Sequence, residues 1–105
     1  MMSVLATENE FNKLFKRATR GEKDVMFLFL SPDYDKTCKQ LRGHLLKGNY
    51  KQGKNLYIVN SFVTPHAFVA YNTTQVPCLV SIINKRRKTE TYLPFIYDSL
   101  GVCLQ

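Results

Sequence analysis

The stretch that most constrains the fold is Val25–Leu46, where a six-residue apolar run is followed by a turn and then by an amphipathic segment. The run VMFLFL is too short to cross a membrane and has the length of a strand buried on both faces. The sequence Ser-Pro-Asp after it predicts a turn, because proline disfavours helix at the residue before it. Cys38, Leu41, Leu45 and Leu46 then recur near helical spacing. The sequence therefore predicts a buried strand that leads into a helix through a tight loop.

The remaining elements alternate between helices and strands around this unit. Thr7 and Glu10 are spaced as a capping box, and Gly21 is placed to end the helix that the box begins. Pro65 and Pro94 are each placed to open a later helix. Strands are expected at 3–6, 56–60, 79–83 and 89–93, helices at 66–72 and 94–104, and a charged turn at 84–88. This order predicts a single α/β domain over residues 1–105, with a mixed sheet flanked by helices on both faces.

Composition narrows the classes of function. The formal net charge of +7 favours an anionic partner, although modest basicity also serves solubility. No apolar run approaches the length of about 18 residues that a membrane span needs, so no membrane partner is expected. Three cysteines without framework spacing favour a reducing compartment, and hence a cytoplasmic location. No cofactor or metal is expected, because His44 and His66 lack metal-ligand spacing to a cysteine and no glycine-rich phosphate loop is present.

Over nearly its whole length the chain resembles the thioredoxin family. The segment Asp35-Lys36-Thr37-Cys38 lies where the family carries Cys-x-x-Cys, and Tyr34 lies where the family carries a tryptophan. Pro65 and Pro77 are spaced like the family's two prolines, the second of which is cis and forms one wall of the active site. The resemblance implies a thioredoxin-like fold and a cis Val76–Pro77 bond. It also implies a binding surface made of Tyr34, Asp35, Val76 and Pro77.

The same resemblance implies that ordinary dithiol chemistry is lost. Asp35 replaces the exposed nucleophilic cysteine, the family's buried carboxylate falls on Phe29, and the lysine that accompanies the carboxylate falls on Ile58. Thiol–disulfide exchange needs an accessible thiolate, a second thiol and a proton acceptor. Cys38 remains, but a carboxylate at Asp35 opposes its ionisation, and Asp35 equally suits the role of a helix N-cap. The domain is therefore expected to bind another protein as an interaction or regulatory module.

Two alternatives stay open from the sequence. Cys38 with Cys78 would make an atypical thiol–disulfide oxidoreductase, although both cysteines also suit a hydrophobic core. In the thioredoxin topology, basic residues far apart in sequence converge at the end opposite Asp35 and Pro77, where they would bind nucleic acid or an acidic protein surface. A solvated face of lysines is the plainer interpretation, and only Tyr50 lies among them to stack on a base. The expected basic surface consists of Arg17, Arg20, Lys54, Lys85, Arg86, Arg87 and Lys88.

Overall fold

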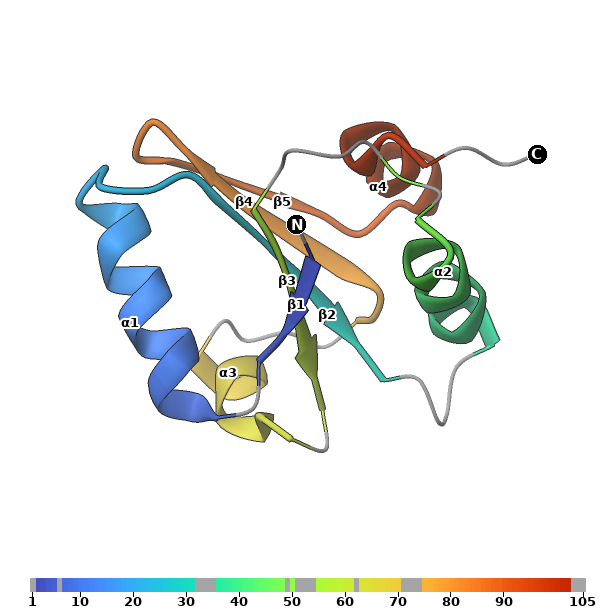
Figure 1. The fold of residues 1–105 in the computed structure, drawn as a ribbon, viewed down its shortest axis with the longest axis horizontal. Coiled ribbons are helices and arrows are strands. Elements are labelled where there is room, and N and C mark those ends of the chain that lie inside the picture. The colour runs from blue at the N-terminus through green and yellow to red at the C-terminus, as the bar shows by residue number, and fades with distance from the viewer. Residues whose placement is uncertain are drawn as a thin grey trace.

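The computed structural model describes residues 2–5, 7–31, 36–48, 50, 55–61, 63–70 and 75–102. Within these residues the elements in chain order are β1 (Met2–Val4), α1 (Glu8–Thr19), β2 (Val25–Leu30), α2 (Lys36–Leu46), β3 (Leu56–Asn60), α3 (Pro65–Ala70), β4 (Cys78–Ile83), β5 (Arg86–Glu90) and α4 (Leu93–Leu100) (Figure 1). The strands form one sheet in the order β1-β3-β2-β4-β5. β2 runs parallel to β3 and antiparallel to β4, so the sheet is mixed.

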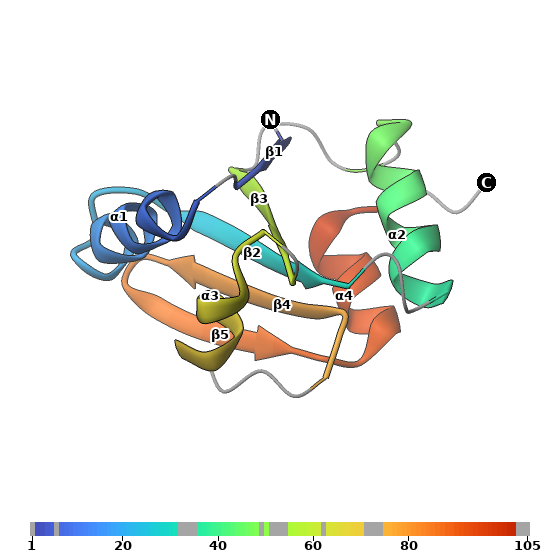
Figure 2. The ribbon, with the colours of Figure 1, turned by 90° about the horizontal axis from the view of Figure 1, so that it is seen from below.

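The core lies on both faces of β2, all of whose residues are buried. Because side chains alternate along a strand, Val25, Phe27 and Phe29 enter one hydrophobic cluster while the intervening residues enter another. The first cluster includes residues of α1 and α3, and the second includes residues of α2 and α4. Figure 2 shows these two helix pairs on opposite sides of the sheet. The structure confirms the predicted buried strand and the α/β sheet with helices on both faces.

Helix ends explain where the sequence prediction holds and where it fails. The Thr7 hydroxyl accepts the Glu10 backbone N–H at 3.2 Å, which is the cap expected at the start of α1. The last helix was expected to reach Leu104 with Gly101 inside it, and that expectation is wrong. Gly101 adopts a left-handed conformation with φ of 66° and ends α4 after Leu100.

Two apolar residues expected in the core are exposed. The sequence predicts Phe95, Ile96, Leu100 and Leu104 as the buried side of the last helix. Ile96 and Leu100 are buried, Phe95 is 59% exposed, and Leu104 lies outside the described residues. Leu46 was placed on the apolar face of α2, yet as the last residue of that helix it is also exposed. Both side chains are exposed for the same reason: a short helix covers the sheet with only one narrow face.

The connection between β4 and β5 is tighter than the sequence suggested. A charged turn at 84–88 followed by a strand at 89–93 was expected, and this is wrong, because Ile83 pairs directly with Arg86. The turn is only Asn84-Lys85, with φ values of 51° and 69°, as a two-residue hairpin requires. An Asp24 carboxylate oxygen accepts the Asn84 backbone N–H at 3.0 Å and holds this turn. The three basic residues after the turn therefore belong to a strand.

Lys85→Gly should raise the free energy of unfolding by about 0.5–1 kcal/mol, because a lysine at positive φ is strained and glycine is not. The exposed lysine side chain contributes little that would offset this gain. Urea denaturation followed by circular dichroism measures the change. Lys88→Gly is the control, because glycine weakens a strand and should lower stability. A stability at or below that of the wild type for Lys85→Gly would contradict the turn geometry.

Candidate functional site

A groove lies where the segment before β4 meets the start of α2 and the start of α4. Its volume is about 390 Å³, and we call it the Pro77 groove. The Val76–Pro77 peptide bond is cis, in agreement with the expectation from the resemblance. Pro77 is buried, and Val76 packs against the hydrophobic clusters on both faces of the sheet. The described residues that line the Pro77 groove are Thr37, Gln75, Val76, Pro77, Thr91, Tyr92 and Leu93.

An exposed pair of aromatic rings lies beside the Pro77 groove, in which Tyr92 lines the groove and Phe95 contacts Tyr92. Tyr92 is 61% exposed and Phe95 is 59% exposed. Their ring centroids are 5.0 Å apart with an angle of 81° between the planes, which is the favourable edge-to-face arrangement. The Tyr92 side chain makes no cap hydrogen bond to α4. Sequence reasoning missed this pair, although the four-residue spacing of Ile96 and Leu100 places Phe95 off the buried face.

The two described cysteines are buried on opposite faces of the sheet. Cys38 belongs to the cluster under α2 and α4, whereas Cys78 belongs to the cluster under α1 and α3. No disulfide joins Cys38 to Cys78 in this structure, and the alternative of a thiol–disulfide oxidoreductase that uses both cysteines stays a prediction. Burial raises the pKa of the Cys78 thiol and so opposes its ionisation. Core packing, the plainer interpretation of these cysteines, agrees with their burial.

Hydrocarbon side chains occupy the positions where the resemblance places a buried carboxylate and its lysine. Phe29 is fully buried, and its ring lies edge-on to Phe68 at a centroid distance of 5.0 Å and to Phe11 at 6.2 Å. Ile58 is also buried, but in the cluster on the other face of the sheet. Neither side chain can accept a proton from a thiol. Their packing gives both residues a structural role.

Several residues singled out from the sequence lie outside the described part of the chain. These residues are Tyr34, Asp35 and Lys54, and the third cysteine of the chain, Cys103, also lies outside that part. Their proposed roles therefore stay predictions. Among the residues that the structure does describe, no group of three or more histidine, cysteine or acidic side chains is placed to hold a metal ion. No helix in the same ranges has the length and hydrophobicity needed to cross a bilayer.

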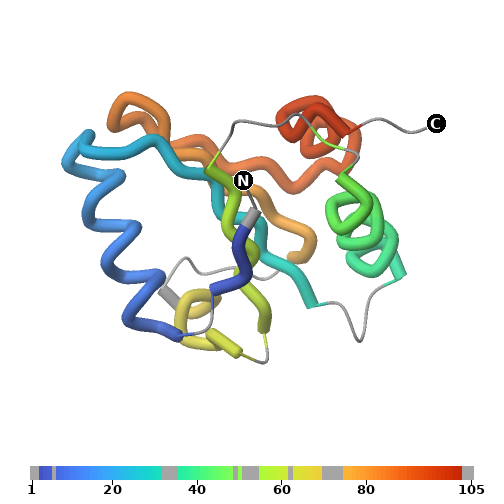
Figure 3. The backbone as a smooth tube through the Cα atoms, viewed as in Figure 1, coloured from blue at the N-terminus to red at the C-terminus, as the bar shows by residue number. Residues whose placement is uncertain are grey.

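Basic residues from α1 and from the hairpin lie at the same end of the molecule. Figure 3 shows the end of α1 beside the turn between β4 and β5. The Lys85 side chain lies over Gly21, because a Cβ atom placed on Gly21 would come within 2.6 Å of Lys85 Cε. Arg20 and Arg17 lie 3.2 Å and 4.0 Å from the Glu22 carboxylate. Exposed pairs of this kind contribute only about 0–1 kcal/mol.

The basic residues of β5 are divided between the two faces of the sheet. Arg86 pairs with Ile83 and Lys88 pairs with Ser81, so both lie on the face covered by α2 and α4. Arg87 pairs with Ile82 and lies on the face covered by α1. The β5 residues of the predicted basic surface therefore lie on both faces of the sheet rather than on one.

Solved thioredoxin structures are similar to this domain as a whole. Thioredoxin O2 from Arabidopsis thaliana aligns with a TM-score of 0.73 and 21% identity, over 95% of this chain and 94% of its own. The chain has the thioredoxin fold. Thioredoxin O1 from the same plant aligns with a TM-score of 0.72 and 18% identity, over 95% of this chain and 97% of its own. The Schistosoma mansoni thioredoxin pre-protein gives 0.70 and 15%, over 94% of each chain. No protein-family profile and no curated protein matches the sequence.

Within this thioredoxin fold the Pro77 groove and the basic residues beside the β4–β5 turn lie at opposite ends of β2. β2 ends at Leu30 and leads toward α2, whose Thr37 lines the Pro77 groove. The other end of β2 begins after Asp24, which holds the hairpin turn. Ligands of open α/β sheets bind beyond the carboxyl ends of the strands, and the Pro77 groove is at that end of β2.

Proposed function

We propose that this thioredoxin-fold domain is a protein-binding module that holds an extended segment of a partner in the Pro77 groove, and that it does not carry out ordinary dithiol–disulfide exchange. The observation that carries this proposal is the exposed Tyr92–Phe95 ring pair, of which Tyr92 lines the groove. Exposed aromatic side chains next to a concavity supply contact area at low entropic cost, which is typical of binding sites.

The backbone beside Pro77 adds a second kind of contact. Within the described part of the chain, the Val76 N–H and C=O make no hydrogen bond. An unpaired backbone donor and acceptor can pair with a peptide in the way that one strand pairs with another. The exposed side chain of Gln75 next to them offers a further polar group. The groove thus combines main-chain pairing with an apolar rim, and these are the two elements of extended-peptide recognition.

The absence of exchange is supported by the thiols and by the surroundings of Phe29. An exchange catalyst presents a thiolate to its substrate, whereas Cys38 and Cys78 are buried and burial keeps the Cys78 thiol protonated. The family's proton acceptor is replaced by the buried ring of Phe29. A cytoplasmic location and the lack of a cofactor stay predictions from the sequence.

Selection of a short peptide from a displayed random library tests the proposal. The affinity of the selected peptide should fall by at least about tenfold for Tyr92→Ala and for Phe95→Ala, since aromatic side chains dominate such interfaces. Val69→Ala is the matched control, because Val69 is an apolar residue that is 77% exposed on α3 and belongs neither to the groove lining nor to the ring pair. A library that yields no binder, or a binder whose affinity neither substitution changes, would overturn the proposal.

A further inference from the structure

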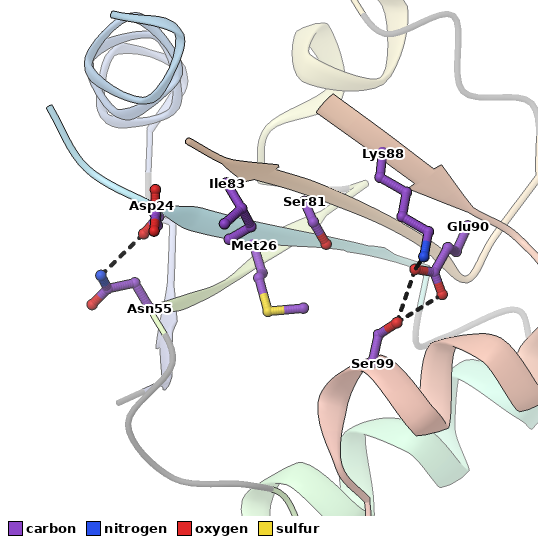
Figure 4. A pocket seen from close by; sticks show the side chains of 8 residues that line it. All are labelled: Asp24, Met26, Asn55, Ser81, Ile83, Lys88, Glu90 and Ser99. Atoms are coloured by element: carbon purple, nitrogen blue, oxygen red, sulfur yellow. Dashed lines mark hydrogen bonds and ion pairs between the residues drawn. The ribbon is translucent and has the colours of Figure 1, made fainter. Parts of the chain in front are cut away.

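A second concavity opens on the α2/α4 face of the sheet, toward the hairpin. Its volume is about 550 Å³, and Figure 4 shows it between β2, the β4–β5 hairpin and α4. A neighbouring concavity of about 510 Å³ shares Ser81, Ile83 and Lys88 with it and adds Asn84 and Arg86. We call the joined surface the hairpin hollow. The described residues that line its larger part are Asp24, Met26, Asn55, Ser81, Ile83, Lys88, Glu90 and Ser99.

The hairpin hollow exists because α4 is short. Along β4, Leu79 is buried in the cluster that includes α4 residues, but α4 ends at Leu100 and the described helices leave Ile83 42% exposed. On the other face of the same strand, Ile82 is buried in the cluster that includes α1. One face of the hairpin is therefore covered and the other presents an aliphatic side chain to solvent.

The two acids of the hairpin hollow already have partners. The buried Glu90 carboxylate accepts the Ser99 hydroxyl at 2.8 Å and lies 3.3 Å from Lys88 Nζ, and Figure 4 shows both side chains turned toward it. An Asp24 carboxylate oxygen accepts the Asn84 backbone N–H. These contacts fix the end of α4 and the hairpin turn, so both acids have a structural role.

Two basic side chains line the hairpin hollow. Lys88 pairs with Glu90, which leaves Arg86 to bind a ligand. Its register partner is the exposed Ile83, so both side chains lie on the same face. Arg86 makes no ion pair or hydrogen bond within the described ranges. Residues 17–24 and 85–90 around it hold seven basic and three acidic side chains, which gives this end of the molecule a net positive charge. The hollow therefore suits a ligand that carries a negative charge next to an aliphatic group.

The size and chemistry of the hollow favour a peptide among anionic ligands. Residues 86 to 90 of β5 span about 13 Å, which is much longer than a phosphate group. The described lining contains no aromatic ring on which a nucleic-acid base would stack. The side chains of Ser81 and Asn84 and the side-chain oxygen of Asn55 instead offer polar groups of the kind that pair with a peptide backbone, while the Asn55 amide N–H donates to the Asp24 carbonyl.

We propose that the hairpin hollow docks a short acidic segment of a partner protein, with a carboxylate on Arg86 and an aliphatic side chain on Ile83. This contact is separate from the Pro77 groove, so either surface can function if the other does not. Electrostatic attraction by the basic end speeds encounter, and the aliphatic contact gives preference for acidic segments that also carry apolar residues.

A fluorescent peptide of alternating aspartate and leucine, measured by anisotropy at low salt, tests this docking. Arg86→Glu should lower its affinity by at least about tenfold, because the substitution places like charges in contact. Arg87→Glu is the matched control with the same change of charge at the next position but on the other face, and it should lower affinity less than about threefold. Ile83→Ser should lower the affinity to that of a peptide of alternating aspartate and glycine.

Amide chemical shifts locate the peptide and separate the two proposals. The expected shifts are at Ser81, Ile83 and Asn84, and Phe95→Ala should leave the affinity for this peptide unchanged.

Equal losses of affinity for Arg86→Glu and Arg87→Glu would show that only the net charge of the protein matters, and would overturn the proposal. Tighter binding of oligothymidylate or of inorganic phosphate would overturn it in favour of a nucleic acid or a small anion. Shifts confined to the Pro77 groove, or no binding, would also overturn it. Arg86→Ala, which introduces no repulsion, should show a smaller loss in the same direction.

Discussion

Phe29→Ala should lower the free energy of unfolding by about 3–5 kcal/mol, the range for a large aromatic side chain removed from a packed core. Phe29 lies on the central strand, fully buried, in ring contact with Phe68 and Phe11. Helices α1 and α3 pack on this cluster, so the cavity would lie between three elements and could not close easily. Small domains have a total stability of only about 5–15 kcal/mol, so the loss is a large part of it.

Urea denaturation followed by far-ultraviolet circular dichroism measures the loss. Phe95→Ala is the matched control, because it removes the same side chain from an exposed position on α4, where the loss is limited to the ring contact with Tyr92 and should stay below about 1 kcal/mol. A loss below about 1 kcal/mol for Phe29→Ala would show that the aromatic cluster is not packed as described.

The packing around Phe29 also opposes the introduction of a proton acceptor at this position. Phe29→Asp would add the cost of burying a carboxyl group to the loss of the ring, since the rings of Phe11 and Phe68 offer no hydrogen bond and the thiol of its register partner Cys78 is only a weak donor. We expect this variant to be less stable than Phe29→Ala. At this position the chain therefore carries a side chain that contributes core packing.

The parts of the fold that the sequence predicted are those set by burial. The continuous apolar run at 25–30 allows one interpretation, a strand covered on both sides, and the helix spacing after it follows from Cys38, Leu41 and Leu45. The resemblance to thioredoxins then supplied the order of elements and Pro77. No comparable signal existed for the hairpin, because arginine and lysine have no strong preference for strands and the Asn-Lys turn lacks the usual glycine.

The parts of the site that the sequence missed depend on where elements end and which face they present. Phe95 is exposed because α4 turns Ile96 and Leu100 toward the sheet, and the exposed Tyr92 is the residue that precedes the helix as its N-cap. Cys38 and Cys78 looked close because both lie near the expected active site, yet the sheet itself separates them. A local pattern carries no information about which side of a sheet a distant segment packs on.

The wild-type protein should reduce a protein disulfide no faster than dithiothreitol alone in a dithiothreitol-coupled assay. The described thiols are buried, and neither Cys38→Ser nor Cys78→Ser should change the rate. A substantial rate that is lost in either serine variant would contradict the binding-module proposal and favour an atypical oxidoreductase. Labelling with a maleimide in a Cys103→Ser background is the companion measurement, and both remaining thiols should react only after denaturation.

Asp35→Cys tests the same conclusion from the other direction, since it recreates Cys-x-x-Cys with Cys38. We expect measurable exchange, because the thioredoxin fold and the cis Val76–Pro77 bond are in place. The rate should stay about 10²–10⁴-fold below that of a complete dithiol site, which is the usual contribution of a general base, because Phe29 accepts no proton. Adding Cys38→Ser removes the resolving thiol and should abolish turnover. Exchange as fast as that of a complete site would mean that Phe29 does not limit the rate. No exchange at all would mean that exchange needs more than a cysteine at position 35.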